Sequence, residues 1–161
     1  MKLKMTACIE APKEKVWNIL SDVQNINLWV ESIQSAICET EKTRGVGTIR
    51  ICHLQGDMTI REKWVEWDEG RSFTYEADAS FAFKWAKNRW SVYSVNGKTL
   101  LTTESEIIPR GGIFGKLLVP LIYIASKKMG RDSLTALKYL IEVGQPYTGK
   151  ISNLPSIAKL C

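Results

Sequence analysis

Alternating apolar and polar positions predict seven β-strands in the first two thirds of the chain. In residues 3–11 every second side chain is apolar, which is typical of a half-buried strand. Comparable runs cover residues 32–41, 47–54, 57–67, 71–79, 83–95 and 98–108. Turn-forming residues separate these runs, and Asn96-Gly97 between the last two is a two-residue hairpin signal.

Apolar positions spaced by three and four residues predict two short helices between the first two strands. The first covers residues 12–23 and begins with Pro12, a residue that suits the first turn of a helix. The second covers residues 25–31 and ends near Trp29.

The same helical spacing predicts one long helix after the strands. It is about 30 residues long, begins near Gly111 and ends at Gly144, and we expect Pro120 to kink or delay it. Its apolar positions are Leu117, Leu121, Ile124, Leu134, Leu137, Leu140 and Ile141. Residues 146–161 show only weak periodicity, so we predict a domain over residues 1–145 followed by a C-terminal tail.

This order of elements predicts an α+β fold. Strands that follow one another without crossover helices pair antiparallel, so the seven strands should form one curved sheet. The long helix is the one predicted element able to cover the concave face of that sheet. One helix does not fill so wide a space, and we therefore expect a cavity between the helix and the sheet.

The strand over residues 57–67 places an acid on its apolar face. Glu62 lies between Ile60 and Trp64 on that face, while Thr59 and Arg61 point the other way. A carboxylate facing a packed core carries a desolvation penalty of several kcal/mol unless it is paired. We therefore predict that Glu62 faces a cavity, and that replacing it with Gln leaves the fold intact.

Composition narrows the class of protein. The 161 residues are 45% hydrophobic and 24% charged, with no apolar run of membrane-spanning or signal-peptide length, so we predict a globular, cytoplasmic protein. The four cysteines (Cys8, Cys38, Cys52 and Cys161) show no C-x-x-C spacing, and we interpret them as unpaired thiols. With His53 as the single histidine and no phosphate-binding glycine motif, we predict no metal and no cofactor.

The positive charge is concentrated in the C-terminal third. Residues 1–109 carry a net charge of −1 and residues 110–161 one of +6, together the +5 of the whole chain. Either a solvated helix face or a weak contact with an anionic membrane explains this. The basic residues on the long helix are Lys116, Lys127, Lys128, Arg131 and Lys138. Basic residues also flank Trp85 and Trp90, but alternation explains them as one wet and one dry strand face, so we predict no nucleic-acid partner.

Several motifs occur together in a fixed order. They are A-P-x-E-x-V-W (Ala11 to Trp17), S-D-V (Ser21 to Val23), G-V-G-T-x-R (Gly45 to Arg50), E-x-x-x-E-W-D-E-G-R (Glu62 to Arg71) and W-x-V-x-x-x-x-G-x-T (Trp90 to Thr99). With them, residues 3–143 resemble the polyketide cyclase/dehydrase-like branch of the START-related (SRPBCC, birch-pollen-allergen-like) superfamily. That resemblance implies a helix-grip fold enclosing an apolar pocket.

The resemblance also implies which residues face the pocket. Glu62 and Arg50 match an acidic and a basic or polar pocket position, and Trp29 and Trp90 match aromatic ones. On the same strand registers Cys52, Leu54, Ile60, Trp64, Phe73, Tyr75 and Thr103 should also face inward. For Arg50 composition alone favours the opposite strand face, that of Ile49, Ile51 and His53, as the interior.

Four classes of function remain open at this stage. The first is binding of a small hydrophobic molecule (a lipid, quinone or polyketide-like compound) in the cavity. The second is a cyclase or dehydratase in which Glu62 and Tyr75 act as acid and base, although this chain lacks the tryptophan-rich strand of the catalytic cyclases. The third is a lipid or quinone carrier that docks at an anionic membrane, and the fourth a toxin-like or chaperone-like surface module. Monomer and homodimer are equally compatible with the sequence.

Overall fold

The structure is a computed structural model that describes residues 1–78, 83–110 and 112–154. For residues 112–118 it describes the backbone only. Its strands are β1 (Lys2–Ile9), β2 (Ile33–Cys38), β3 (Ile49–Leu54), β4 (Thr59–Asp68), β5 (Ser72–Ala77), β6 (Phe83–Val95) and β7 (Lys98–Pro109). Its helices are α1 (Lys13–Ser21), η1 (Val23–Leu28), α2 (Gly112–Val143) and η2 (Ile151–Asn153), of which η1 and η2 are 3₁₀ helices.

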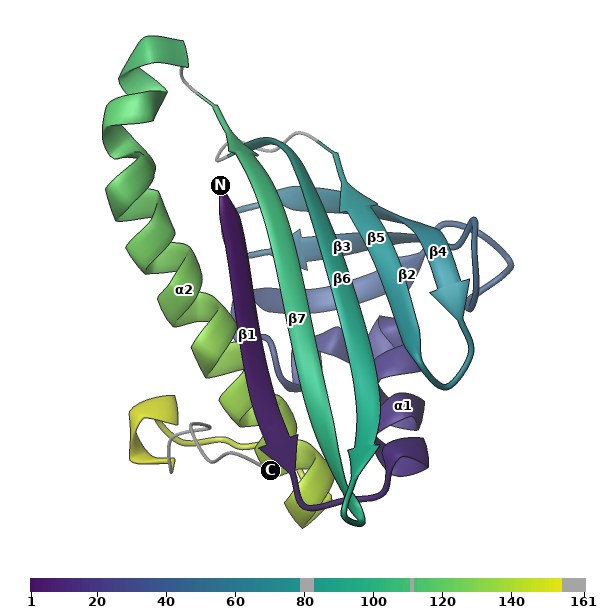
Figure 1. Cartoon of the computed structure of the whole chain (residues 1–161). Coiled ribbons are helices and arrows are strands. Elements are labelled where there is room, and N and C mark those ends of the chain that lie inside the picture. Colours follow the sequence, from purple (N-terminus) through teal and green to yellow (C-terminus); the bar gives the residue numbers. More distant parts are fainter. Residues whose placement is uncertain (79–82, 111, 155–161) are drawn as a thin grey trace.

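Within the described residues, seven strands form one antiparallel sheet in the order β1-β7-β6-β5-β4-β3-β2. The sheet curves strongly, so that β2, β3 and β4 lie across from β1 and β7, and α2 runs along the β1 edge (Figure 1). The predicted α+β fold is confirmed. From β3 to β7 each strand lies beside the next one along the chain, and the described parts of their connections contain no helix that could cross the sheet.

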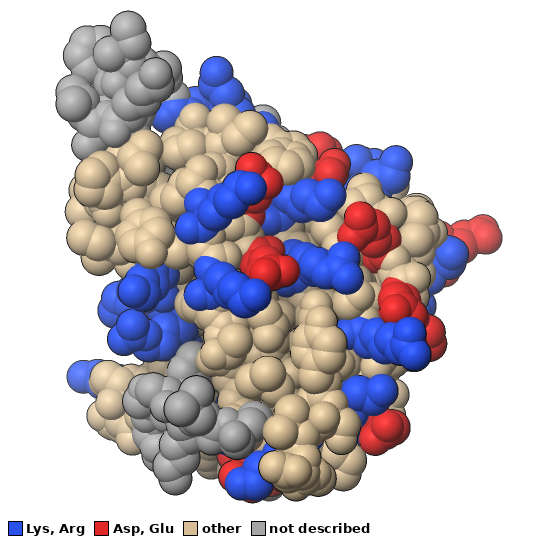
Figure 2. Space-filling model, viewed as in Figure 1, with Lys and Arg blue, Asp and Glu red and all other residues tan. Residues whose placement is uncertain are grey.

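Cross-strand ion pairs cover the outer face of the sheet. Lys4 pairs with Glu104 at 2.9 Å and Arg89 with Glu66 at 2.9 Å, and basic and acidic side chains alternate across this face in Figure 2. Each exposed pair contributes at most about 1 kcal/mol. Their main consequence is the register, since an outer face of charged side chains leaves the alternate positions for the interior.

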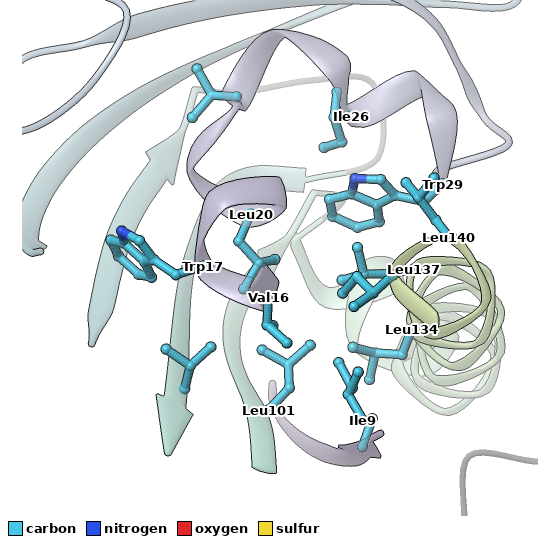
Figure 3. Close-up of a cluster of buried hydrophobic side chains, with 14 of the residues drawn as sticks. Ile9, Val16, Trp17, Leu20, Ile26, Trp29, Leu101, Leu134, Leu137 and Leu140 are labelled. Carbon is cyan, nitrogen blue, oxygen red and sulfur yellow. The ribbon is translucent and has the colours of Figure 1, made fainter. Parts of the chain in front are cut away.

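One end of the sheet is closed by a solid apolar core. In Figure 3 the side chains of α1, the C-terminal half of α2, and strands β1 and β7 meet there. Its fully buried members include Ile9, Val16, Leu101, Leu134, Leu137 and Ile141. Trp17, at 3% exposure, also belongs to this core. At this end the interior is filled by side chains rather than by a cavity.

Of the α2 side chains that the structure describes, residues 119–143, the buried ones all follow Gly130. The periodicity predicts one continuous apolar stripe, but Leu121 is 66% exposed and Ile124 is 64% exposed. The helix approaches β1 closely at Gly130, where an added Cβ atom would collide with the Cε atom of Met5. Toward its N-terminus α2 diverges from the β1 edge, and it runs through Pro120 without ending (Figure 1).

The predicted C-terminal tail is described as far as residue 154. Tyr147 packs edge-on against Tyr139 of α2 with ring centroids 5.0 Å apart, and Ile151 packs against the core. Residues 145–154 therefore fold back on the end of α2.

The cysteines only partly match the prediction of unpaired thiols. Cys38 and Cys52 are free, whereas Cys8 is disulfide-bonded, so the prediction is wrong for Cys8. Cys161 lies outside the described residues.

Candidate functional site

The register of β3 places Arg50 and Cys52 in the interior. Arg50 lies opposite Glu62 of β4 and is 3% exposed, and Cys52 lies opposite Ile60 and is 1% exposed. Ile49 and Ile51 take the outer face and are half-buried. The inward face is therefore the one that the family resemblance implies and composition alone disfavours.

A β-bulge in β4 brings an additional tryptophan into the interior. The register shifts between Trp64 and Glu66, so that Trp64 lies opposite Tyr75 and Trp67 lies opposite Phe73. Without the bulge, two residues three apart would point to opposite faces. With it, both indoles pack on Phe73, with ring centroids at 6.1 Å for Trp64 and 5.4 Å for Trp67.

Arg50 and Glu62 form a buried ion pair. The Nε and Nη2 atoms of Arg50 donate to the same carboxylate oxygen, Oε2 of Glu62, at 2.8 and 2.5 Å. The Nη1 atom of Arg50 donates to the main-chain oxygen of Val23 in η1 at 2.5 Å, and the Cys52 thiol donates to Oε2 of Glu62 at 3.3 Å. The guanidinium group thus joins strand β4 to the short helix that closes this end of the sheet.

Burial and the charge of Glu62 keep Arg50, Cys52 and Tyr75 protonated at neutral pH. Burial by itself lowers the pKa of Arg50, but the charge of Glu62 opposes this, and the net pKa is raised, so Arg50 stays cationic. Burial and then the charge of Glu62 raise the pKa of Cys52 to about 12. The same two causes raise the pKa of the Tyr75 hydroxyl, which therefore stays protonated at neutral pH.

Aromatic rings form the walls around the ion pair. The guanidinium carbon of Arg50 lies 4.9 Å from the Trp64 ring centroid and 5.8 Å from that of Tyr75. The ring centroids of Trp64 and Tyr75 lie 5.1 Å apart. On the other side of the concave face, Trp29 meets Trp90 edge-on at 5.4 Å, and Figure 3 shows Trp29 beside Leu137 and Leu140 of α2. Trp29 thus links η1, β6 and the long helix.

Several polar atoms in this interior lack partners among the described residues. The indole nitrogen of Trp64 and the hydroxyl of Thr103 are buried and make no hydrogen bond. The described hydrogen bonds to Glu62 all reach Oε2, and none reaches Oε1. Leaving a buried donor or acceptor unsatisfied costs about 1–3 kcal/mol, so a hydrogen bond from water or from another small molecule would stabilise each of these atoms.

The predicted pocket residues fall into two groups. One surrounds the ion pair and comprises Arg50, Cys52, Glu62, Trp64, Phe73 and Tyr75, all buried. Trp29, Trp90 and Thr103 lie farther along the concave face, with Thr103 opposite Trp90. Leu54 and Ile60 are half-buried near the ends of their strands.

Sequence reasoning missed two polar groups on this face. Asn88 lies opposite Tyr75, and its side-chain oxygen accepts a hydrogen bond from Ser105 at 2.6 Å. The two groups are Asn88 and Ser105. Asn88 is two residues from Trp90 and Ser105 is two residues from Thr103, and residues two apart on a strand share a face, so this spacing would have identified them. A further polar group, the main-chain oxygen of Val23, could not be predicted from the pattern of side chains, because every residue carries such an oxygen.

Two hollows on the surface lie away from the predicted pocket residues. One of about 390 Å³ is lined by residues that include Lys13, Arg71 and Arg89. The other, of about 210 Å³, lies between α1 and the loop at Thr43 and Arg44. Neither includes a residue of the predicted pocket.

Comparison with solved structures supports the same fold. The chain is 17% identical to a protein from Thermus thermophilus (TM-score 0.76; 89% of this chain and 99% of that one covered) and 15% identical to the Zhui aromatase/cyclase from a Streptomyces species (TM-score 0.76; 88% and 93%). It is 12% identical to Ara h 8.0201 (TM-score 0.64; 88% and 97%). At these identities the likeness concerns the fold alone.

Comparison of sequences identifies the family. No curated protein matches the chain in sequence. The sequence model described as "Polyketide cyclase / dehydrase and lipid transport" matches residues 1–142, nearly the whole of the domain with its sheet and long helix. The chain therefore belongs to the polyketide cyclase/dehydrase and lipid transport family.

Proposed function

We propose that the protein binds an elongated, largely apolar small molecule with polar groups on the concave face of the sheet. The observation that carries this proposal is a pair of buried polar atoms without a partner among the described residues, Trp64 Nε1 and Thr103 Oγ1, within a wall of aromatic rings. Beside them lies Glu62, whose Oε1 atom no described hydrogen bond reaches. The family, whose description includes lipid transport, supports the same function.

The chemistry of these atoms defines the ligand. Glu62 Oε1 accepts a hydrogen bond and Trp64 Nε1 donates one, so an adjacent hydroxyl and carbonyl group would satisfy both. Trp64 lies on β4 and Thr103 on β7, three strand spacings or about 14 Å apart along the sheet. A ligand that reaches both ends is therefore elongated, and the aromatic walls favour flat rings or an unsaturated chain.

Trp29 controls the entrance in this proposal. Trp29 is 8% exposed and its ring contacts Trp90, between η1 and α2. A ligand that reaches Thr103 has to displace this indole. The Arg50 bond to the Val23 main chain holds the start of η1, so movement is expected in the segment that follows it.

The test uses Thr103→Val with Thr102→Val as its matched control. Thr102 is the neighbouring residue, is also buried, and its side chain points to the outer face. The ligands are 1-hydroxyanthraquinone, which carries an adjacent hydroxyl and carbonyl, and anthracene, which carries neither. Binding is measured by quenching of tryptophan fluorescence, and the stability of the free protein by urea unfolding.

We expect Thr103→Val to stabilise the free protein by about 1 kcal/mol, because it removes an unsatisfied hydroxyl. It should weaken binding of 1-hydroxyanthraquinone about two- to tenfold, the range for one hydrogen bond, and leave anthracene binding unchanged. Thr102→Val should affect neither ligand. If neither compound binds to the unmodified protein, or if both variants lower binding equally, the interior site is rejected.

The family is also compatible with the second candidate, a cyclase or dehydratase. In that case Glu62 would take a proton from the ligand and Tyr75 would donate one, and the protonated state of Tyr75 suits a donor. The hydrogen bonding of Glu62 to Arg50 favours binding over proton abstraction. A change in ligand mass with time that Glu62→Gln and Tyr75→Phe each abolish would establish the enzymatic function instead.

A further inference from the structure

The described N-terminal half of α2 exposes large apolar side chains. Over residues 119–131 the exposed fractions are 66% for Leu121, 64% for Ile124 and 55% for Met129, and Tyr123 is 38% exposed. A helix on the surface of a globular protein ordinarily turns such residues inward. Here they lie together on one segment, which runs beside the β1 edge of the sheet (Figure 1).

The most exposed of these residues point away from the sheet. Gly130 marks the inner side of α2, because it contacts Met5 of β1. Leu121 precedes Gly130 by nine residues, or two and a half turns, and so lies on the opposite side of the helix. Ile124 lies one turn after Leu121 on that outer side. Movement of α2 toward the sheet would therefore leave both side chains exposed.

Basic residues follow directly on the same segment. Lys127, Lys128 and Arg131 are exposed, and residues 119–131 contain no acidic residue. Lys128 lies one turn after Ile124 and pairs with Asp132 at 2.7 Å. Lys138 belongs elsewhere, since its ammonium group donates to the Cys8 main chain and pairs with Glu142. The membrane contact expected from charge alone thus centres on residues 121–131.

We propose that this segment, with Leu121 and Ile124 on its outer side and Lys127, Lys128 and Arg131 as its cations, docks on an anionic lipid bilayer. The apolar side chains would enter the interfacial region while the cations meet lipid phosphates, as in a helix that lies in the membrane plane. No helix in the described part of the chain is long and apolar enough to cross a bilayer. The contact is therefore peripheral.

The positive charge of this segment favours an anionic bilayer as its partner over a second copy of the chain. Two copies joined through this segment would bring the charges of Lys127 and Arg131 together, since the nearest acidic residue on the helix, Asp132, already pairs with Lys128. An anionic surface neutralises the cations instead. Each cation held near such a surface raises the affinity about fivefold. The proposal does not depend on the identity of the interior ligand.

Vesicle flotation tests the proposal with phosphatidylcholine vesicles that contain or lack phosphatidylglycerol. Leu121→Ser with Ile124→Ser removes the apolar contact, and Lys127→Glu with Arg131→Glu removes the charge. The control for the first pair is Ile37→Ser with Val143→Ser, which alters exposed apolar residues elsewhere. The control for the second is Lys15→Glu with Lys63→Glu, which makes the same charge change on α1 and β4.

We expect binding to vesicles with phosphatidylglycerol at an ionic strength of about 0.01 M and its loss at about 1 M, where the Debye length is only about 3 Å. Each test pair should weaken binding at least tenfold, and each control pair less than twofold. Equal effects of test and control pairs would overturn the proposal. So would a sedimentation experiment without vesicles in which Leu121→Ser with Ile124→Ser converts a dimer to a monomer.

Discussion

Arg50 and Glu62 lie directly opposite each other on β3 and β4, and two nitrogens of Arg50 meet a single oxygen of Glu62. The alternation around Glu62 predicted an acid facing a cavity, and the family resemblance implied that Arg50 faces the same cavity. In the structure the acid is one half of an ion pair whose partner is 3% exposed, and no described hydrogen bond reaches its second oxygen. The same side chain thus has a structural and a proposed binding role.

Glu62→Gln is expected to destabilise the protein by about 3 kcal/mol, because it leaves the buried charge of Arg50 unpaired. This differs from the expectation for an acid in an open cavity, where the fold would be unaffected. Urea unfolding measures the effect.

The double variant Arg50→Met with Glu62→Leu separates the lost charge pair from the lost side chain. It should recover most of the stability, since replacing a buried pair by apolar residues is often neutral or better. It should also lose binding of 1-hydroxyanthraquinone. A single Glu62→Gln variant as stable as the unmodified protein would show that solvent reaches this pair.

Cys52 is expected to make stability fall at alkaline pH. Its pKa rises from 9.0 in the unfolded chain to about 12 in the folded protein, so folding favours the neutral thiol. The resulting stabilisation is complete below pH 9.0 and is lost as the pH rises toward 12, by up to about 4 kcal/mol. Urea midpoints across this range should fall less for Cys52→Val than for the unmodified protein. Parallel curves would contradict the assignment.

Gly130 and Met5 are expected to be energetically coupled. Gly130→Ala gains about 1 kcal/mol of helix propensity but places a Cβ atom against the end of the Met5 side chain. The two effects oppose each other, so the single variant should change stability little. In a Met5→Ala background the same substitution should stabilise the protein by about 1 kcal/mol. A double-mutant cycle of urea unfolding energies measures the coupling, and additive effects would show that α2 and β1 are not in close contact here.

Glu69 is expected to link stability to acidic pH. Its carboxylate accepts hydrogen bonds from the indoles of Trp67 at 2.8 Å and Trp17 at 2.7 Å, and these lower its pKa below 4.5. The stabilisation is therefore present above pH 4.5 and is lost as the pH falls through the lowered pKa. Glu69→Gln should lower stability at neutral pH and match the unmodified protein in strong acid. Tryptophan fluorescence during urea unfolding measures both, and an equal deficit at both pH values would contradict this origin.

The sequence alone determined the order and type of the elements. Alternation and turn residues are local properties, so the seven strands and the long helix appear within a few residues of their predicted bounds. The ends of β6 at Phe83 and Val95 match the prediction, because an Asn-Gly turn fixes one end of that hairpin. Even the presence of an acid on an interior strand face was visible in the alternation around Glu62.

The tertiary structure decided what each interior position contacts. The inward face of β3 depends on Arg50 finding both Glu62 and a main-chain oxygen of η1, partners 12 and 27 residues away. The bulge that turns Trp67 inward depends on the pairing of β4 with β5. Helical period alone gave Leu121 and Leu134 the same status, yet among the described side chains of α2 the buried ones all follow Gly130, so Leu121 is exposed and Leu134 is buried. Periodicity records which side of an element is apolar, whereas only the packing of distant segments decides whether anything covers that side.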